Sequence, residues 1–95
     1  MVVGCGRIVL RIHDCRSLKA KRRVVKAVIA RIRNRFNVSV AEIEDNDVYQ
    51  RAVIGLAVVS NAAGEVDARI EKILDHVEEM GLAEMVGSEM EIIHL

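Results

Sequence analysis

The residues from Val2 to Ile12 alternate between two faces, which is the pattern of a half-buried β-strand. The even positions are apolar from Ile8 onward, whereas the odd positions include Arg7 and Arg11. The pattern therefore predicts a strand with one face toward a core and a second face that carries two arginines.

The segment from Leu18 to Phe36 has the period of an α-helix. Its apolar residues fall on one stripe at 100° per residue, and they are Leu18, Val25, Val28, Ile29, Ile32 and Phe36. Ser17 stands where an N-cap belongs. Asn37 is expected to end the helix, since Asn tolerates the left-handed conformation of a C-cap.

The rest of the chain predicts three further strands and a second helix. These are strands at Val38–Ile43, Tyr49–Ser60 and Leu82–Ile93, and a helix at Glu65–Met80. The third strand is apolar on both parities, which indicates a central strand covered on both faces. Turn residues at Glu44–Asp47, a break with a capping residue at Asn61–Gly64 and a C-cap glycine at Gly81 separate the elements. Gly87 interrupts the last strand.

The order β-α-β-β-α-β predicts a single α+β domain over residues 1–95 with a ferredoxin-like fold. In this fold a four-stranded antiparallel sheet carries two helices on one face. Strands one and three are then central, and their open face carries Arg7, Val9 and Arg11 beside Val53, Gly55, Ala57 and Val59. If the third strand is turned over, Ile54 and Leu56 occupy that face instead.

The net charge of zero conceals two oppositely charged parts of the chain. Residues 1–51 hold twelve basic and five acidic side chains, whereas residues 52–95 hold two basic and nine acidic ones. The segment from Arg16 to Arg35 contains nine basic residues and no acidic residue. The net charge therefore does not exclude a nucleic-acid ligand.

The basic residues of the first helix predict a surface that binds phosphate. Five of them fall within about 100° of one another on a helical wheel, and these are Lys19, Arg22, Arg23, Lys26 and Arg33. We expect backbone contacts from these five and from Lys21, with Arg7 and Arg11 as a second patch. Two alternatives remain open. The basic helix pairs with the acidic second helix, within one copy or between two copies, or it is merely a solvated face.

The scarcity of aromatic residues restricts how nucleic acid is recognised. Phe36 and Tyr49 are the only aromatic residues in the chain. RNA-recognition motifs stack bases on aromatic residues of the two central strands, and the open-face positions of those strands, from Cys5 to Arg11 and from Val53 to Ala57, carry no such residue here. We therefore expect contacts with RNA backbone or RNA shape, with weak sequence preference.

The open sheet face predicts self-association. Small residues such as Gly55 and Ala57 allow a second chain to approach closely, and an apolar sheet surface needs a cover. We therefore expect a homodimer through this face. The alternatives are that the C-terminal segment covers the face or that the face stays exposed.

Candidate catalytic and metal sites are weak in this sequence. His13, Asp14 and Cys15 share one loop, but neighbours in sequence do not make a catalytic triad, and no oxyanion donor is apparent. The carboxylates of Glu42, Glu44, Asp45 and Asp47 lack the spacing of a calcium loop and suggest a solvated hairpin. We expect no enzymatic activity, no catalytic residue, no metal and no cofactor.

Cysteine usage and hydropathy indicate the compartment. If residues 5 to 13 form a strand, Cys5 and Cys15 start roughly 30 Å apart, too far for a disulfide. Two free thiols suit a reducing cytoplasm. No signal peptide is apparent, and the longest apolar run, Ala52–Val59, is shorter than the roughly 20 residues of a membrane span. A cytoplasmic protein without membrane association is expected.

Two segments of this sequence resemble the YlxP-like family, a domain of unknown function. They are the run from Arg16 to Arg23, of sequence RSLKAKRR, and the run from Arg31 to Glu42, of sequence RIRNRFNVSVAE. Gln50–Val53 and Gly55–Asn61 resemble it too, whereas the similarity weakens after Met80. The resemblance implies a ferredoxin-like fold, a small bacterial cytoplasmic protein and no established enzymatic activity. Genes of the family often lie beside genes for translation initiation and ribosome maturation, which implies an association with RNA or the ribosome.

Two positions depart from the pattern expected of that family. Ala20 stands where Glu is expected, which leaves the basic segment without any acid. Tyr49 stands where Trp is expected and keeps an aromatic residue at the start of the third strand, where it can still serve as an anchor or a contact.

Overall fold

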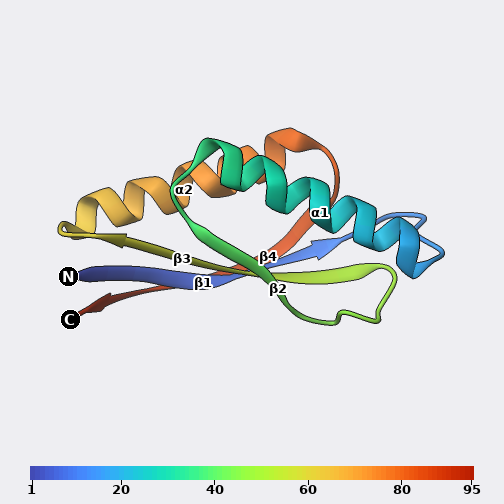
Figure 1. Cartoon of the computed structure of the whole chain (residues 1–95), viewed down its shortest axis with the longest axis horizontal. Coiled ribbons are helices and arrows are strands. Elements are labelled where there is room, and N and C mark those ends of the chain that lie inside the picture. The colour runs from blue at the N-terminus through green and yellow to red at the C-terminus, as the bar shows by residue number, and fades with distance from the viewer.

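The computed structural model describes residues 1–95 and contains the six expected elements in the expected order (Figure 1). They are β1 (Val2–Arg11), α1 (Leu18–Arg35), β2 (Ser39–Glu44), β3 (Arg51–Ser60), α2 (Ala63–Met80) and β4 (Glu84–His94). The strands form one antiparallel sheet in the order β2-β3-β1-β4. Both helices lie on the same face of this sheet (Figure 1). This arrangement confirms the ferredoxin-like α+β fold with β1 and β3 at the centre.

The register between β1 and β3 decides which residues face the helices. Ile8 lies opposite Ile54, and Arg7 lies opposite Gly55. The even-numbered residues of both strands therefore form the core side, where Leu10 and Leu56 are buried. The open face carries Arg7 and the odd-numbered residues of β3, so the first of the two predicted orientations of the third strand is confirmed.

Each helix buries one aliphatic stripe against the sheet. In α1 the buried apolar residues are Val25, Val28 and Ile32, and in α2 they are Val66, Ile70, Ile73 and Val77. A glycine on β1 lets α2 approach closely, because a Cβ atom at Gly4 would lie 2.3 Å from Val66 Cγ1. Since a close-packed core has little room for extra atoms, this position suits only glycine.

The helix ends agree with the sequence in two cases and differ in two. Ser17 Oγ accepts a hydrogen bond from the Ala20 amide at 3.1 Å, and Gly81 ends α2 in the left-handed conformation at φ 65°. Asn37 does not end α1, because the cap is Phe36 in an extended conformation. The α2 helix starts at Ala63, two residues before the expected Glu65, and its N-cap residue forms no side-chain hydrogen bond.

The strand ends shift by a few residues from the expected bounds. The third strand begins at Arg51, so Tyr49 lies in the β2–β3 hairpin and not in the strand. The pairing of β1 with β4 shifts by one residue beside Gly87, where Val9 faces Gly87 and Leu10 faces Met85. Both cysteines are free thiols. Neither helix is long and apolar enough to cross a membrane.

Candidate nucleic-acid interface

Four basic side chains from the first half of α1 surround one surface hollow. Lys19, Arg22, Arg23 and Lys26 alone line this hollow, which has a volume of about 540 Å³. All four side chains are exposed. None of them takes part in any of the four ion pairs of the chain. We call these four residues the basic stripe.

The helical period explains why the basic stripe faces outward. Val25, Val28 and Ile32 fix the buried direction of α1, and the stripe residues lie on the other side of the wheel. Arg35 marks the flank toward α2, since its Nη1 lies 3.1 Å from His76 Nδ1. The stripe therefore points away from α2.

Arg33 lies on the same side of α1 as the basic stripe but has a structural contact of its own. Its Nη2 donates to the carbonyl oxygen of Val40 at 2.9 Å, which joins the last turn of α1 to the edge strand β2. The side chain remains exposed. We therefore keep Arg33 as a secondary contact of the interface.

Lys21 is buried and cannot belong to a phosphate-binding surface. Its side chain is only 1% exposed, and Nζ lies 3.0 Å from Glu42 Oε2 in an ion pair whose angles fall outside hydrogen-bond geometry. The same ammonium donates to the Asp45 carbonyl. The expectation that Lys21 contacts phosphate is therefore wrong, because this residue holds α1 against the β2–β3 hairpin. Its place beside Val25 and Val28 on the wheel is the sequence signal for this role.

The second predicted patch lies on the open sheet face, and one of its two arginines is paired. Arg7 Nη1 donates to Glu44 Oε1 at 2.8 Å, while the buried Arg7 Nε has no partner. Arg7 also lies opposite Glu89 of β4 in the sheet register. Arg11 is exposed and forms no ion pair. The two residues therefore do not form an uncompensated basic patch.

The carboxylates of the β2–β3 hairpin are matched by cations almost one for one. Glu42 pairs with Lys21, Glu44 with Arg7, and Asp45 Oδ2 with Arg51 Nε at 2.6 Å. Asp47 alone has no ion-pair partner. These separate pairs explain the acidic cluster, and no group of three or more His, Cys, Asp or Glu is placed to hold a metal ion.

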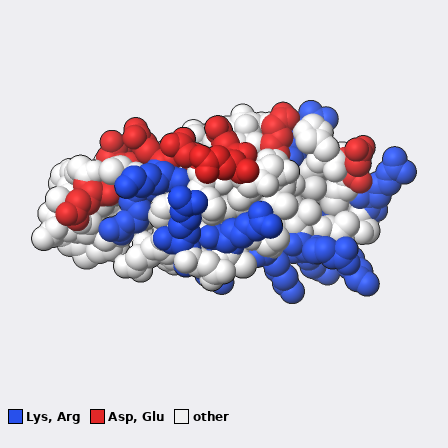
Figure 2. Space-filling view, turned by 90° about the horizontal axis from the view of Figure 1, so that it is seen from above, with Lys and Arg blue, Asp and Glu red and all other residues white.

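The charges of the two helices lie in separate bands on the helix face of the molecule. Seen from this side, Lys and Arg atoms run largely along one flank and Asp and Glu atoms along the other (Figure 2). No ion pair joins α1 to α2. Pairing of the basic and acidic helices within one copy is therefore not what accounts for the basic segment.

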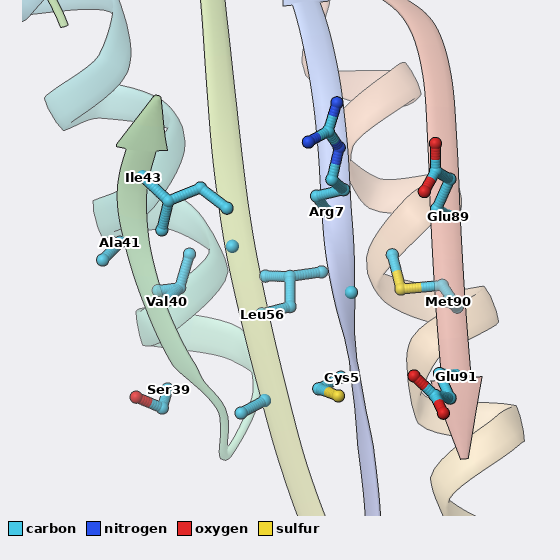
Figure 3. A pocket seen from close by; sticks show the side chains of 13 residues that line it. Cys5, Arg7, Ser39, Val40, Ala41, Ile43, Leu56, Glu89, Met90 and Glu91 are labelled. Carbon is cyan, nitrogen blue, oxygen red and sulfur yellow. The ribbon is translucent and has the colours of Figure 1, made fainter. Parts of the chain in front are cut away.

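The open face of the sheet contains a shallow groove of about 670 Å³. Cys5, Ala41 and Ala57 line its floor, and Ile43 covers Gly55, since a Cβ atom there would lie 2.8 Å from Ile43 Cγ2. Arg7 lies at one side of the groove, close to Glu89 on the neighbouring strand (Figure 3). Acidic and basic groups are mixed here, so this face lacks the single sign of charge that the basic stripe has.

The loop of His13, Asp14 and Cys15 does not assemble a catalytic arrangement. The Cys15 side chain is buried and its Sγ contacts the Ser17 carbonyl at 3.5 Å. His13 turns instead toward β4, where its Nε2 lies 3.1 Å from Glu84 Oε2. His76 is partly buried and packs edge-on against Phe36, with ring centroids 5.7 Å apart.

Comparison with known proteins gives a family but no activity. A relative from Bacillus subtilis (strain 168), "Uncharacterized protein YlxP", is 34% identical over 77 residues, which are 81% of this chain and 84% of that protein. The solved structure of protein YJCS superposes with a TM-score of 0.54 at 10% identity and covers 97% of this chain and 99% of that chain. A de novo designed protein with a ferredoxin fold, LFR1 1, superposes with a TM-score of 0.49 at 14% identity, over 100% of this chain and 87% of the design.

The similarity to YJCS supports the fold alone. A family model described as "Protein of unknown function (DUF503)" matches residues 3–90, nearly the full length of the chain. This chain therefore belongs to the DUF503 family, the YlxP-like proteins of unknown function.

Proposed function

We propose that this chain is a non-enzymatic cytoplasmic module that binds RNA, free or in the ribosome, through the basic stripe of α1. The observation that supports this function is the hollow lined only by Lys19, Arg22, Arg23 and Lys26. Unpaired cations side by side repel one another, so the arrangement is stabilised by an anion with closely spaced charges. A nucleic-acid backbone supplies such charges along its length.

The proposed recognition acts on phosphate and carries little sequence information. Each phosphate that the stripe neutralises releases counterions, so the affinity falls as salt rises. Four contacts to a single strand give a slope of about −3 for log K against log salt, at roughly −0.7 per phosphate.

The experiment compares two triple variants of equal net charge. One variant is Arg22→Gln, Arg23→Gln and Lys26→Gln within the stripe. The control is Arg31→Gln, Arg35→Gln and Lys72→Gln, which removes three exposed cations that form no ion pair and lie outside the stripe. Binding of a labelled RNA is followed by fluorescence anisotropy across a salt series.

We expect the stripe variant to bind weakly and to lose about 2 units of the salt slope, because three phosphate contacts are missing. The control should keep both its affinity and its slope. If the two variants weaken binding equally, only net charge matters and the basic stripe is not the interface.

A second candidate function is self-association, and the separated charge bands favour it. Since no ion pair joins α1 to α2 within one copy, the basic flank of one copy can meet the acidic flank of another. The apolar groove on the open sheet face is a second surface for such a homodimer. RNA binding and pairing of the helices between copies would compete for the same stripe.

A further inference from the structure

Of the two residues Phe36 and Tyr49, Tyr49 is the one whose ring is exposed. Tyr49 is 46% exposed, and its neighbour Val48 is 45% exposed. The other aromatic residue, Phe36, forms a T-shaped contact with His76 and packs against the core, so its ring is not free to stack on a ligand. A ring of this kind exposed to water is available to stack on a ligand.

The hairpin that carries Tyr49 is fixed against the start of α1. The Gln50 side chain donates to the Cys15 carbonyl at 3.4 Å, and the Ile12 amide donates to the Gln50 carbonyl at 2.9 Å. Lys21 holds the Asp45 carbonyl from inside the fold. The hairpin and the first turns of α1 therefore lie at the same end of the molecule (Figure 1).

The ring also lies at the end of the molecule where the basic stripe begins. The α1 helix lies along the β2 edge of the sheet, as the Arg33 contact with Val40 shows. The stripe points away from α2 and so outward past β2. Because the Gln50 side chain bonds to the Cys15 carbonyl, four residues before Lys19, a strand that lies on Lys19 and Arg22 and continues past the start of α1 can reach Tyr49.

The acids of the hairpin do not block this path. Glu44 and Asp45 are each paired with an arginine, at 2.8 Å and 2.6 Å. Only Asp47 keeps an unpaired charge beside Tyr49. The cations of the stripe have no such partners, so the local balance favours an incoming phosphate.

We propose that Tyr49 stacks on an unpaired base of a single-stranded nucleic acid whose phosphates lie on the basic stripe. The ligand class is then single-stranded, because the bases of a duplex are already stacked on one another and offer no free face. This inference rests on the proposed function and adds the base contact and the strandedness of the ligand. Stacking tolerates every base, so sequence preference stays weak.

The sequence provides its own reporter for this contact. The chain has one tyrosine and no tryptophan, so its tyrosine emission comes from Tyr49 alone. Three probes of equal length are titrated: single-stranded oligouridylate, an abasic phosphodiester strand without bases, and an RNA duplex. We expect oligouridylate to quench the emission, whereas the abasic strand binds through its phosphates and leaves the emission unchanged.

Variants at Tyr49 separate the ring from the backbone contacts. Tyr49→Ala should weaken oligouridylate binding about 5- to 150-fold, the range for loss of one stacked base, and leave binding of the abasic strand unchanged. Tyr49→Phe should retain the affinity because it keeps the ring. Tyr49→Leu, which is apolar but cannot stack as a ring does, should behave like Tyr49→Ala.

The possible failures are distinguishable. If oligouridylate and the abasic strand bind equally and neither changes the emission, stacking is wrong while phosphate binding stands. The same conclusion follows if Tyr49→Leu binds oligouridylate as tightly as the parent chain does. It follows too if the duplex binds as tightly as the single strand. If no probe binds in a salt-dependent way, both the proposed function and this inference are wrong.

Discussion

The ammonium group of Lys21 is buried between the start of α1 and the β2–β3 hairpin. It faces the Glu42 carboxylate, whose side chain is 16% exposed, and the carbonyl oxygen of Asp45. Removal of two charges from water is costly, and their mutual attraction offsets this cost only while both are present. The pair therefore fixes the hairpin in place, and loss of one member leaves the other charge uncompensated.

We expect Lys21→Met to lower the free energy of unfolding by about 2–4 kcal/mol, since it leaves Glu42 without its cation inside the fold. The matched control is Lys19→Met, which changes the same residue type on the exposed side of the same helix and should stay within about 0.5 kcal/mol of the parent. Urea unfolding followed by circular dichroism measures both.

Lys21→Met combined with Glu42→Leu should recover most of the lost stability, because an apolar pair can replace a buried ion pair. If the double variant is as unstable as Lys21→Met alone, the loss does not come from an unpaired Glu42. A stability of Lys21→Met equal to that of Lys19→Met would show that the pair has no structural role.

At the residue scale the sequence indicated which side chains are cationic but not which of them are free. Lys21 shares its wheel position with the buried aliphatic residues, yet a lysine there can also extend its long stem to the surface. Its carboxylate partner lies 21 positions away on another element, and this pairing follows only from the folded structure. The exposure of Tyr49 depends likewise on the hairpin, whose end at Arg51 differs from the expected strand.

At the scale of elements, the two helices differ in how they begin. Ser17 Oγ caps α1 through the Ala20 amide, whereas Ala62 at the start of α2 has no side chain able to cap. Because a side-chain N-cap contributes about 1 kcal/mol, Ser17→Ala should lower the free energy of unfolding by about that amount. Ala62→Ser should raise it by a similar or smaller amount. Thermal and urea unfolding of the two single variants test this.

A neutral Ser17→Ala would mean that water satisfies the first amides of α1 as well as the hydroxyl does. Ser39→Ala, at an exposed strand position without a capping role, is the control for loss of a serine hydroxyl.

The order and type of the elements could be predicted because each has a clear period along the chain. The orientation of β3 could not, since Ala52, Val53 and Ile54 are apolar on both parities and all three are buried. Only the pairing of Arg7 with Gly55 resolves it. The predicted end of α1 at Asn37 was wrong because the chain is already extended at Phe36, where it leaves the helix toward β2. The preference of Asn for a left-handed cap does not outweigh this extended path.

At the scale of the whole molecule, the two charge bands predict self-association that depends on salt. Two copies placed with α1 of each beside α2 of the other bring opposite charges together. At low ionic strength we expect a mass above the 10.6 kDa of one chain, with a return toward 10.6 kDa as salt screens the charges. Light scattering coupled to size-exclusion chromatography over a salt series measures this.

A mass that stays at twice 10.6 kDa at all salt concentrations would point instead to the apolar open face of the sheet as the interface. The triple variant Arg22→Gln, Arg23→Gln and Lys26→Gln separates the two surfaces, because it should abolish association through the helices and leave association through the sheet intact. A monomer at every salt concentration would contradict self-association.

The separation of the two bands also determines the electrostatic field that acts on an approaching polyanion. With no net charge, the molecule acts at long range as a dipole. A distant polyanion orients such a dipole more than it attracts it. At physiological ionic strength the Debye length is about 8 Å, shorter than the 21 Å and 19 Å of the two smaller dimensions of the molecule. A phosphate that arrives beside α1 therefore responds mainly to the nearby cations, while the more distant acids of α2 are partly screened. For a ligand within this distance, the molecule is a basic protein.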